Sequence, residues 1–388
     1  NGCWQNEHVD AASPALPFRG GWFLYLGYEL AGQVEPTLTL HRPTGLPIAA
    51  AVRVHCALVM DRAAGRAWIV CEQGAEAKRE QVVRDIARVD WEAPLAEDGP
   101  LLTGTVSEEP AARYTDAVLK TKAYIAAGDI YQVNLAQRFA AALPDGFGER
   151  DLFALYERLR QVSPAPMAAY LRCGPREILS TSPETFLRMH GRAIETRPIK
   201  GTRPRSSDPE KDRLLKTELS GSAKDRAENL MIVDLLRNDL SKSCLPGSVN
   251  VPELFSIEHY PNVHHMVSSV CGILRPGVTA VQLLRDCFPG GSITGAPKIR
   301  AMEIIADLEK GARGPYGGAV GYISFSGNLD LAITIRTACI ESGTLTVRAG
   351  AGIVADSDPE TERMETVNKA MAIQRALELT RQGGKAPQ

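Results

Sequence analysis

The segment Ile178-Leu-Ser-Thr-Ser-Pro-Glu-Thr-Phe-Leu-Arg-Met-His-Gly-Arg-Ala-Ile-Glu-Thr-Arg197 decides the fold class. It contains three stretches of alternating apolar and polar residues, at Ile178–Thr181, Thr185–Met189 and Ala193–Arg197. Turn residues separate these stretches, Ser182-Pro183 after the first and His190-Gly191 after the second. Alternation between turn dipeptides predicts three strands that form a β-meander.

On both sides of this segment, helical and extended patterns alternate irregularly. Ser222 precedes a long helical pattern, with Asp225 at the capping-box spacing and an apolar stripe through Leu230, Val233, Leu236 and Leu240. Other predicted helices cover 114–127, which ends at Gly128, 297–311 and 358–380. Further predicted strands cover 21–28, 51–61, 319–325, 332–340 and 344–349. Residues 73–110 are polar and predict a linker or surface excursion. Strands mixed with helices without a regular βαβ rhythm predict an α+β fold.

The composition is that of an ordinary globular protein. The 388 residues are 44% hydrophobic and 23% charged, which suggests two domains with a sizeable core. Lys and Arg number 44 against 46 Asp and Glu, so a general nucleic-acid or anionic-membrane binder is disfavoured. No apolar run reaches the roughly 18 residues that a membrane span needs, and the first residues have no signal-peptide pattern. Eight scattered cysteines predict reduced thiols in a cytoplasmic protein.

Two glycine motifs approach nucleotide-binding patterns without fitting them. Gly350-Ala-Gly352-Ile-Val-Ala355 matches G-x-G-x-x-A, but no helix opens directly after it. Gly290 and Gly295 have P-loop spacing, but Ala296-Pro297 stands where Lys-Ser/Thr is required. Such segments can still bring backbone N–H groups to an anionic ligand.

Carboxylates recur at helical spacing in two places. Asp225 and Glu228 are three residues apart, and Glu362, Glu365 and Lys369 would share one face of the last helix. The Glu365–Lys369 pair could be a solvated ion pair. Alternatively, if the two helices face each other, their carboxylates could hold Mg²⁺ in a shell that substrate oxygens complete.

Lys200 lies in a basic segment, Glu195-Thr-Arg-Pro-Ile-Lys-Gly-Thr-Arg-Pro-Arg205. The segment could be a solvated strand end and loop. However, a Lys between Ile199 and Gly201 near a strand end could also be a partly desolvated amine, which is a usable nucleophile. His264-His265 is too isolated to predict a metal site.

Several long motifs, in order, resemble the chorismate-utilising enzymes. They are Gly128-Asp-Ile-Tyr-Gln-Val-Asn-Leu-Ala-Gln137, Ser182-Pro-Glu184, Arg197-Pro-Ile-Lys-Gly-Thr-Arg203, Ala227-Glu-Asn-Leu-Met-Ile-Val-Asp-Leu235, Gly290-Gly-Ser-Ile-Thr-Gly-Ala-Pro-Lys298, Ile335-Arg336-Thr and Ala349-Gly-Ala-Gly-Ile-Val-Ala-Asp356. The resemblance covers about residues 110–380 closely. It implies an α+β fold in which two antiparallel sheets pack as a β-sandwich with helices outside. It also implies an N-terminal family region at 1–110 that lacks its start, packed against a chorismate-binding catalytic domain at 111–388.

Two positions distinguish branches of this family. Isochorismate and salicylate synthases carry a Lys where this chain has Gln132, which cannot act as a base for water. Anthranilate synthases typically have Ala in place of Lys200. The resemblance is therefore strongest to the members that aminate chorismate at C4 to 4-amino-4-deoxychorismate, for 4-aminobenzoate and folate. Anthranilate synthase component I, or a non-catalytic regulatory relative, is the alternative.

The resemblance also implies roles for individual residues. Glu184 would be the general acid and Lys200 the nucleophile, while Glu228 and Glu365 would hold Mg²⁺, supported by Asp225 and Glu362. The residues implied to bind chorismate are Thr202, His265, Ser292, Tyr316, Arg336, Gly350, Gly352 and Lys369. The chain has no Gly-x-Cys-x-Gly glutaminase segment, so a separate glutamine amidotransferase is the expected source of ammonia.

Overall fold

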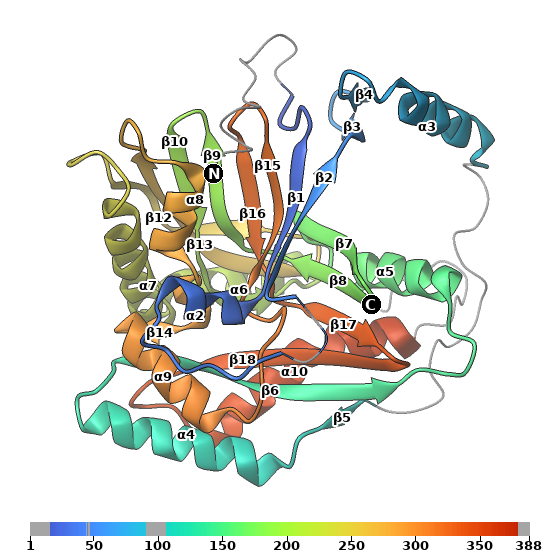
Figure 1. Cartoon of the computed structure of the whole chain (residues 1–388). Coiled ribbons are helices and arrows are strands. Elements are labelled where there is room, and N and C mark those ends of the chain that lie inside the picture. The colour runs from blue at the N-terminus through green and yellow to red at the C-terminus, as the bar shows by residue number, and fades with distance from the viewer. Residues whose placement is uncertain (1–15, 44, 46, 91–105, 379–388) are drawn as a thin grey trace.

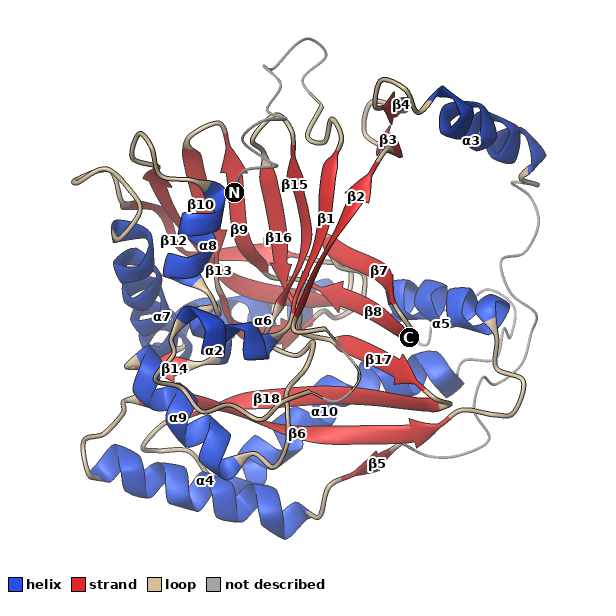
Figure 2. Ribbon diagram, in the orientation of Figure 1, coloured by secondary structure: helices blue, strands red, loops and turns tan. Residues whose placement is uncertain are grey.

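The computed structural model describes residues 16–43, 45, 47–90 and 106–378, and contains two large antiparallel sheets (Figures 1 and 2). In order across the first sheet, the strands are β11 (Ile199–Pro204), β13 (Val263–Ile273), β10 (Ala193–Arg197), β9 (Thr185–His190), β16 (Leu329–Ile333), β15 (Ala319–Ser324), β1 (Gly21–Leu26) and β2 (Ala49–Val54), with β12 (Asn250–His259) beside β13. The second sheet runs β14 (Gly295–Ala296), β6 (Gln132–Ala142), β18 (Thr344–Ile353), β17 (Thr337–Glu341), β8 (Arg176–Ser182) and β7 (Met167–Cys173), with β5 (Ser107–Glu108) beside β6. Two antiparallel sheets are thus confirmed, and their packing as a β-sandwich stays a prediction.

The predicted three-stranded meander is wrong in its first pairing. β9 and β10 form the expected hairpin, with Ala193 opposite His190. β8 instead lies in the second sheet, between β7 and β17. The chain therefore passes from one sheet to the other at Ser182-Pro183-Glu184, because the strand partners of β8 come from distant sequence.

A second passage between the sheets lies beside the first. The strand predicted at 332–340 is two strands, β16 in the first sheet and β17 in the second. The two passages are tied together, since the Ser182 hydroxyl donates to the Ile333 carbonyl at 2.5 Å and the Thr181 amide donates to the Arg336 carbonyl at 3.1 Å. Glu184 and Arg336 consequently lie next to the junction of the two sheets.

Helices pack beside both large sheets, except α3 (Glu76–Arg88), which lies beside the hairpin of β3 (Cys56–Asp61) and β4 (Arg66–Cys71) (Figure 2). Their bounds are α2 (Ala31–Val34), α3 (Glu76–Arg88), α4 (Ala111–Ala126), α5 (Glu149–Val162), α6 (Pro209–Gly221), α7 (Ala223–Ser241), α8 (Ala280–Cys287), α9 (Lys298–Leu308) and α10 (Pro359–Glu378), with single 3₁₀ turns η1 (Tyr28–Leu30) and η2 (Gly291–Ile293). In the described part of the chain, no helix is both long and apolar enough to cross a membrane.

The helix α7 begins as the sequence predicts, because the Ser222 hydroxyl accepts a hydrogen bond from the Asp225 amide at 3.2 Å. The buried stripe of α7 differs in part from the predicted one, because Leu230 is 45% exposed and Ile232 is buried. Ile232, Val233 and Leu236 pack with α8 against the first sheet. Burying each such side chain stabilises the fold by roughly 1.5–3 kcal/mol.

The second sheet has its own core. Leu155 and Leu159 of α5 and Ile373 and Leu377 of α10 pack against β17 and β18. Tyr25 of β1 contacts the second sheet near Ile178, so the two sheets also share buried contacts. Because Ile373 and Leu377 are buried in the core of the second sheet, α10 is held against that sheet.

The N-terminal region differs from its prediction in two places. The strand predicted at 51–61 is divided between β2 and β3 (Cys56–Asp61), which forms a separate hairpin with β4 (Arg66–Cys71). The linker predicted at 73–110 contains α3, and residues 91–105 lie outside the described residues. β1 is hydrogen bonded to β15, so this region contributes strands to the first sheet.

Candidate active site

Glu184 lies at the passage between the sheets and is 4% exposed. Burial raises the pKa of its carboxyl to about 7, an effect that the nearby Ser292 hydroxyl and Lys200 ammonium partly oppose. The Ser292 hydroxyl is buried and has no hydrogen-bond partner among the described residues. A carboxyl in these surroundings can carry a proton near neutral pH and give it to a bound molecule.

Lys200 projects from β11 toward the same junction. Burial lowers the pKa of its ammonium group, and the carboxylates of Glu228 and Glu184 act against that shift. A Cβ atom added at Gly352 would lie 2.3 Å from Gln132 Nε2, so the approach of Gln132 requires glycine here, and it would lie 3.7 Å from Lys200 Nζ, an ordinary contact distance. Lower basicity leaves a larger share of the amine neutral and nucleophilic.

Glu228 on α7 and Glu365 on α10 both act electrostatically on Lys200, although Glu365 and Lys369 are 49% and 44% exposed and form the i, i+4 ion pair of the first alternative. Burial raises the pKa of Glu228, and Asp225 and Glu365 add to that rise, whereas Lys200 and Lys224 oppose it. Burial also acts to raise the pKa of Glu365, but Lys369, with Nζ 2.6 Å from Glu365 Oε1, makes the net shift downward. Lys369 Nζ also donates to the Gly350 carbonyl at 2.8 Å, which attaches α10 to β18.

The expected supporting carboxylates have partners of their own. Asp225 accepts a hydrogen bond from Arg203 at 3.2 Å, and Glu362 accepts one from the Ser357 hydroxyl at 2.7 Å. Among the described residues, no group of three or more His, Cys, Asp or Glu is arranged to hold a metal. Glu228 and Glu365 are two carboxylates, the donor type of which Mg²⁺ commonly takes one or two, with water and substrate completing its shell.

Arg336 and Tyr316 supply donors on the other side of the junction. Arg336 has a φ of 48°, in the left-handed region that non-glycine residues rarely adopt. Burial lowers the pKa of its guanidinium, and within the described ranges the side chain makes no hydrogen bond or ion pair. Tyr316 is buried, and its hydroxyl donates to Asn134 Oδ1 at 3.0 Å beside Gly350.

Thr202 and His265 form a neighbouring pair on β11 and β13, with Thr202 Oγ1 2.8 Å from His265 Nδ1. Burial, helped by Arg336, lowers the pKa of His265 to about 3, so the ring is neutral at physiological pH. The structure therefore gathers Glu184, Lys200 and the two carboxylates at one junction and sets the other predicted residues around it.

Sequence reasoning missed several buried groups behind this site. Asn134 is the partner of Tyr316, and Arg313 donates to the Asn134 and Ile293 carbonyls at 2.7 and 2.8 Å. The spacing of Glu309 and Arg313, four residues apart, was the available signal. It could not show that the pair is buried.

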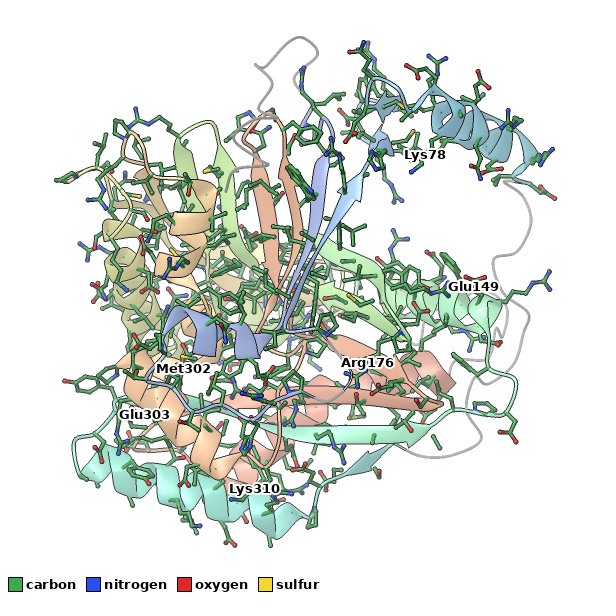
Figure 3. All side chains as sticks on the ribbon, in the orientation of Figure 1. Lys78, Glu149, Arg176, Met302, Glu303 and Lys310 are labelled. Atoms are coloured by element: carbon green, nitrogen blue, oxygen red, sulfur yellow. The ribbon has the colours of Figure 1, made fainter. Side chains whose placement is uncertain are left out.

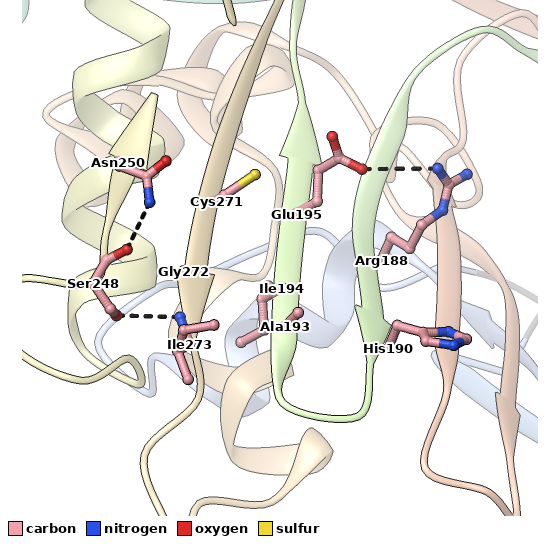
Figure 4. Close-up of a pocket in the computed structure, with 10 residues that line it drawn as sticks. All are labelled: Arg188, His190, Ala193, Ile194, Glu195, Ser248, Asn250, Cys271, Gly272 and Ile273. Atoms are coloured by element: carbon pink, nitrogen blue, oxygen red, sulfur yellow. Dashed lines mark hydrogen bonds and ion pairs between the residues drawn. The ribbon is translucent and has the colours of Figure 1, made fainter. Parts of the chain in front are cut away.

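A separate open cavity of about 350 Å³ lies on the first sheet, away from these residues (Figure 4). Arg188, His190, Glu195, Asn250 and Cys271 are among its lining side chains. None of the predicted site residues lines it, so its size alone does not make it the site of chemistry.

Together, these features place a buried acid, a desolvated amine and carboxylates from two helices near the junction of the two sheets. Residues 3–375 match the family model described as chorismate binding enzyme, and the chain belongs to this family. The resemblance seen in the motifs is confirmed.

Individual relatives show which members of the family the chain is similar to. The chain is 43% identical over 367 residues to aminodeoxychorismate synthase component 1 of Salmonella typhimurium, covering 94% of this chain and 78% of the relative. It is 41% identical over 379 residues to anthranilate synthase component 1 of Thermus thermophilus, covering 95% and 79%. The crystal structure of anthranilate synthase component I from Streptococcus pneumoniae superposes with a TM-score of 0.84 at 31% identity, covering 96% of this chain and 84% of that one.

Proposed function

We propose that this chain is component I of an aminodeoxychorismate synthase, which replaces the C4 hydroxyl of chorismate with an amine from ammonia. The observation that carries the proposal is the lysine at position 200, placed among Glu184, Glu228 and Glu365. The product, 4-amino-4-deoxychorismate, keeps its enolpyruvyl group and serves 4-aminobenzoate and folate synthesis.

In this proposal, Glu184 protonates the C4 hydroxyl, which leaves as water while the neutral amine of Lys200 adds at C2. Ammonia then attacks C4, the ring double bonds shift back toward C2, and the C2–N bond breaks with its electron pair returning to the Lys200 amine. The ammonium formed at C4 gives a proton back to Glu184. The pKa of about 7 for Glu184 supports its role as acid, because much of the carboxyl is protonated at neutral pH. The lowered pKa of Lys200 supports its role as nucleophile.

The remaining residues would hold the substrate dianion. Arg336 can bind a carboxylate through two N–H groups, and Tyr316 with the backbone at Gly350 and Gly352 supplies further polar contacts. Lys369 offsets negative charge near the acidic helices. Thr202, His265 and Ser292 would line the ring.

Mg²⁺ would be held by Glu228 and Glu365, with Asp225 and Glu362 supporting them. When bound, the ion neutralises and orients the ring carboxylate of chorismate. Without it, Glu228 and Glu365 repel that carboxylate, so the site's affinity for the dianion depends on the cation.

A separate glutamine amidotransferase would supply the ammonia in the cytoplasm. The words component 1 in the names of the relatives support a partner subunit. The resemblance likewise supports the β-sandwich description of the two sheets.

Anthranilate synthase component I is the second candidate, favoured by the relative at 41% identity and the superposable crystal structure. That reaction releases pyruvate. Lys200 argues against it, because a buried amine at this position supports covalent addition to the ring.

The test is to incubate the chain with chorismate, an ammonium salt and Mg²⁺ and to determine product mass and pyruvate. An aminated product that retains the enolpyruvyl group supports the proposal. Anthranilate with an equal amount of pyruvate would favour the second candidate. Lys200→Ala should slow formation of the product by roughly 1,000-fold or more. Lys216→Ala, which changes an exposed lysine on α6, is the matched control.

A further inference from the structure

A buried ion pair replaces a strand at the edge of β6. β14 pairs with β6 at Gln132 and Val133, and β5 pairs with it at Phe139 and Ala140. Between them, Glu309 Oε1 accepts from the Ala136 amide at 2.8 Å, and Arg313 Nη2 donates to the Asn134 carbonyl at 2.7 Å. Two side chains thus satisfy backbone groups that a neighbouring strand would otherwise pair.

The Arg313 guanidinium bonds four acceptors at once. Nε and Nη2 donate to the two carboxylate oxygens of Glu309 at 2.9 and 2.5 Å, and Nη1 donates to the Ile293 carbonyl at 2.8 Å. Its carbon lies 4.6 Å from the ring centre of Tyr28, and the Arg313 side chain is 2% exposed. A lysine has one nitrogen and cannot span these acceptors, whereas the guanidinium fork can.

Both carbonyls belong to residues that carry the site. Ile293 directly follows Ser292, whose hydroxyl faces Glu184. Asn134 accepts the hydrogen bond of Tyr316 through its side chain at 3.0 Å. One guanidinium therefore joins the loop of Ser292 to the strand that orients Tyr316.

We propose that Arg313 is a positioning residue, which fixes Ser292 and Tyr316 relative to each other and thereby sets the affinity of the site for chorismate. The inference rests on the proposed function of these two side chains in chorismate binding. Arg313 itself touches neither the substrate nor the reacting atoms.

Arg313→Lys is the informative variant, because it keeps a buried positive charge beside Glu309. We expect the Kd for chorismate, measured by calorimetry with Mg²⁺ and without ammonium, to rise about tenfold or more. A rise of this size corresponds to weakening the contacts of both Ser292 and Tyr316 with chorismate. We also expect the alkaline limb of the kcat/KM profile to move to higher pH, because the Ser292 hydroxyl holds the pKa of Glu184 down. If Arg313 only stabilised the fold, the substitution would change neither the Kd for chorismate nor the pH profile.

Two controls separate positioning from stability. Arg176→Met removes another buried arginine (labelled in Figure 3), which begins β8 at the end opposite Ser182 and pairs with Glu341. It should lower stability without changing the Kd. Glu309→Gln leaves the bonds of Arg313 to both carbonyls in place and should change the Kd less than threefold.

The proposal is overturned if Arg313→Lys binds chorismate as tightly as Arg176→Met and keeps the parental pH profile. Arg313→Met adds a larger perturbation, and if that variant does not fold, Arg313→Lys still decides the question. Because chorismate binding is measured directly, the outcome stands even if the parental chain forms a different product. A wrong product would count against the proposed reaction, and an unchanged Kd would count against the positioning role.

Discussion

Replacing the buried acid by its amide should make the protein more stable at alkaline pH while removing most of its activity. Burial raises the pKa of Glu184 from 4.5 to about 7 in the folded chain. At 1.36 kcal/mol per pH unit, ionising this carboxyl in place costs about 3 kcal/mol more than ionising it in the unfolded chain. The amide side chain of the variant Glu184→Gln is neutral at every pH, so the variant does not incur that cost.

The sign follows from the direction of the shift. Since the folded state holds the proton more tightly, the contribution of Glu184 to stability is fully present below pH 4.5 and is lost as the pH rises through about 7. The free energy of unfolding of Glu184→Gln, relative to the parent, should therefore rise by about 3 kcal/mol between pH 4.5 and pH 8.5. Urea unfolding of both chains across this range measures the difference.

Activity should change in the opposite direction. Loss of a general acid lowers kcat by roughly 100- to 10,000-fold, and the parental rate should decline above pH 7 as Glu184 ionises. Glu195→Gln is the control, because Ser269 and Arg197 outweigh burial and lower the pKa of Glu195, so its effect on stability should have the opposite pH dependence. A stability difference for Glu184→Gln that stays constant within 1 kcal/mol from pH 4.5 to 8.5 would refute the buried, proton-holding carboxyl.

Other substitutions test the remaining parts of the site. Lys200→Ala should slow formation of the aminated product by roughly 1,000-fold or more while chorismate binding in the presence of Mg²⁺ stays within a few-fold; an active variant would eliminate covalent addition by Lys200. Glu228→Ala should raise the Mg²⁺ concentration for half-maximal activity by about tenfold or more, and Asp234→Ala, on an exposed position of the same helix, should not; equal responses would remove Glu228 from the metal site. Lys298→Met removes hydrogen bonds to Asp239 and to the Cys287 and Pro289 carbonyls, while Lys242 still donates to Asp239 at 3.1 Å, so it should lower the free energy of unfolding by about 1–3 kcal/mol in urea titrations; a loss under about 0.5 kcal/mol would show that these hydrogen bonds contribute no net stability.

Local features of the chain could be predicted from sequence because their causes lie within a few residues. Ser222 caps α7 through the amide three residues later, and the Gly191 turn joins β9 to β10. Gly128 follows the end of α4 with a φ of 82°, which a glycine adopts without a steric penalty. The family motifs also predicted which residue types would belong to the site.

Contacts between distant segments required the tertiary structure. The periodicity of residues 178–197 could not show that β8 and β9 belong to different sheets, because alternation reveals which residues share a face and not which strand is the partner. Glu228 and Glu365 lie on helices far apart in the chain, and whether Glu365 is a solvated ion pair or part of a site depends on where α7 is packed. The burial of Arg313 likewise required the tertiary structure, because a spacing of four residues from Glu309 is common in sequences and does not indicate a buried ion pair.

The sequence by itself determined the helices, the hairpins and the chemical groups available to this protein, since hydrogen bonding and side-chain periodicity act locally. The tertiary structure decided which groups meet, because burial and desolvation depend on the packing of both sheets. Only that packing brings Glu184 and Lys200 together and shifts the pKa of each toward neutrality.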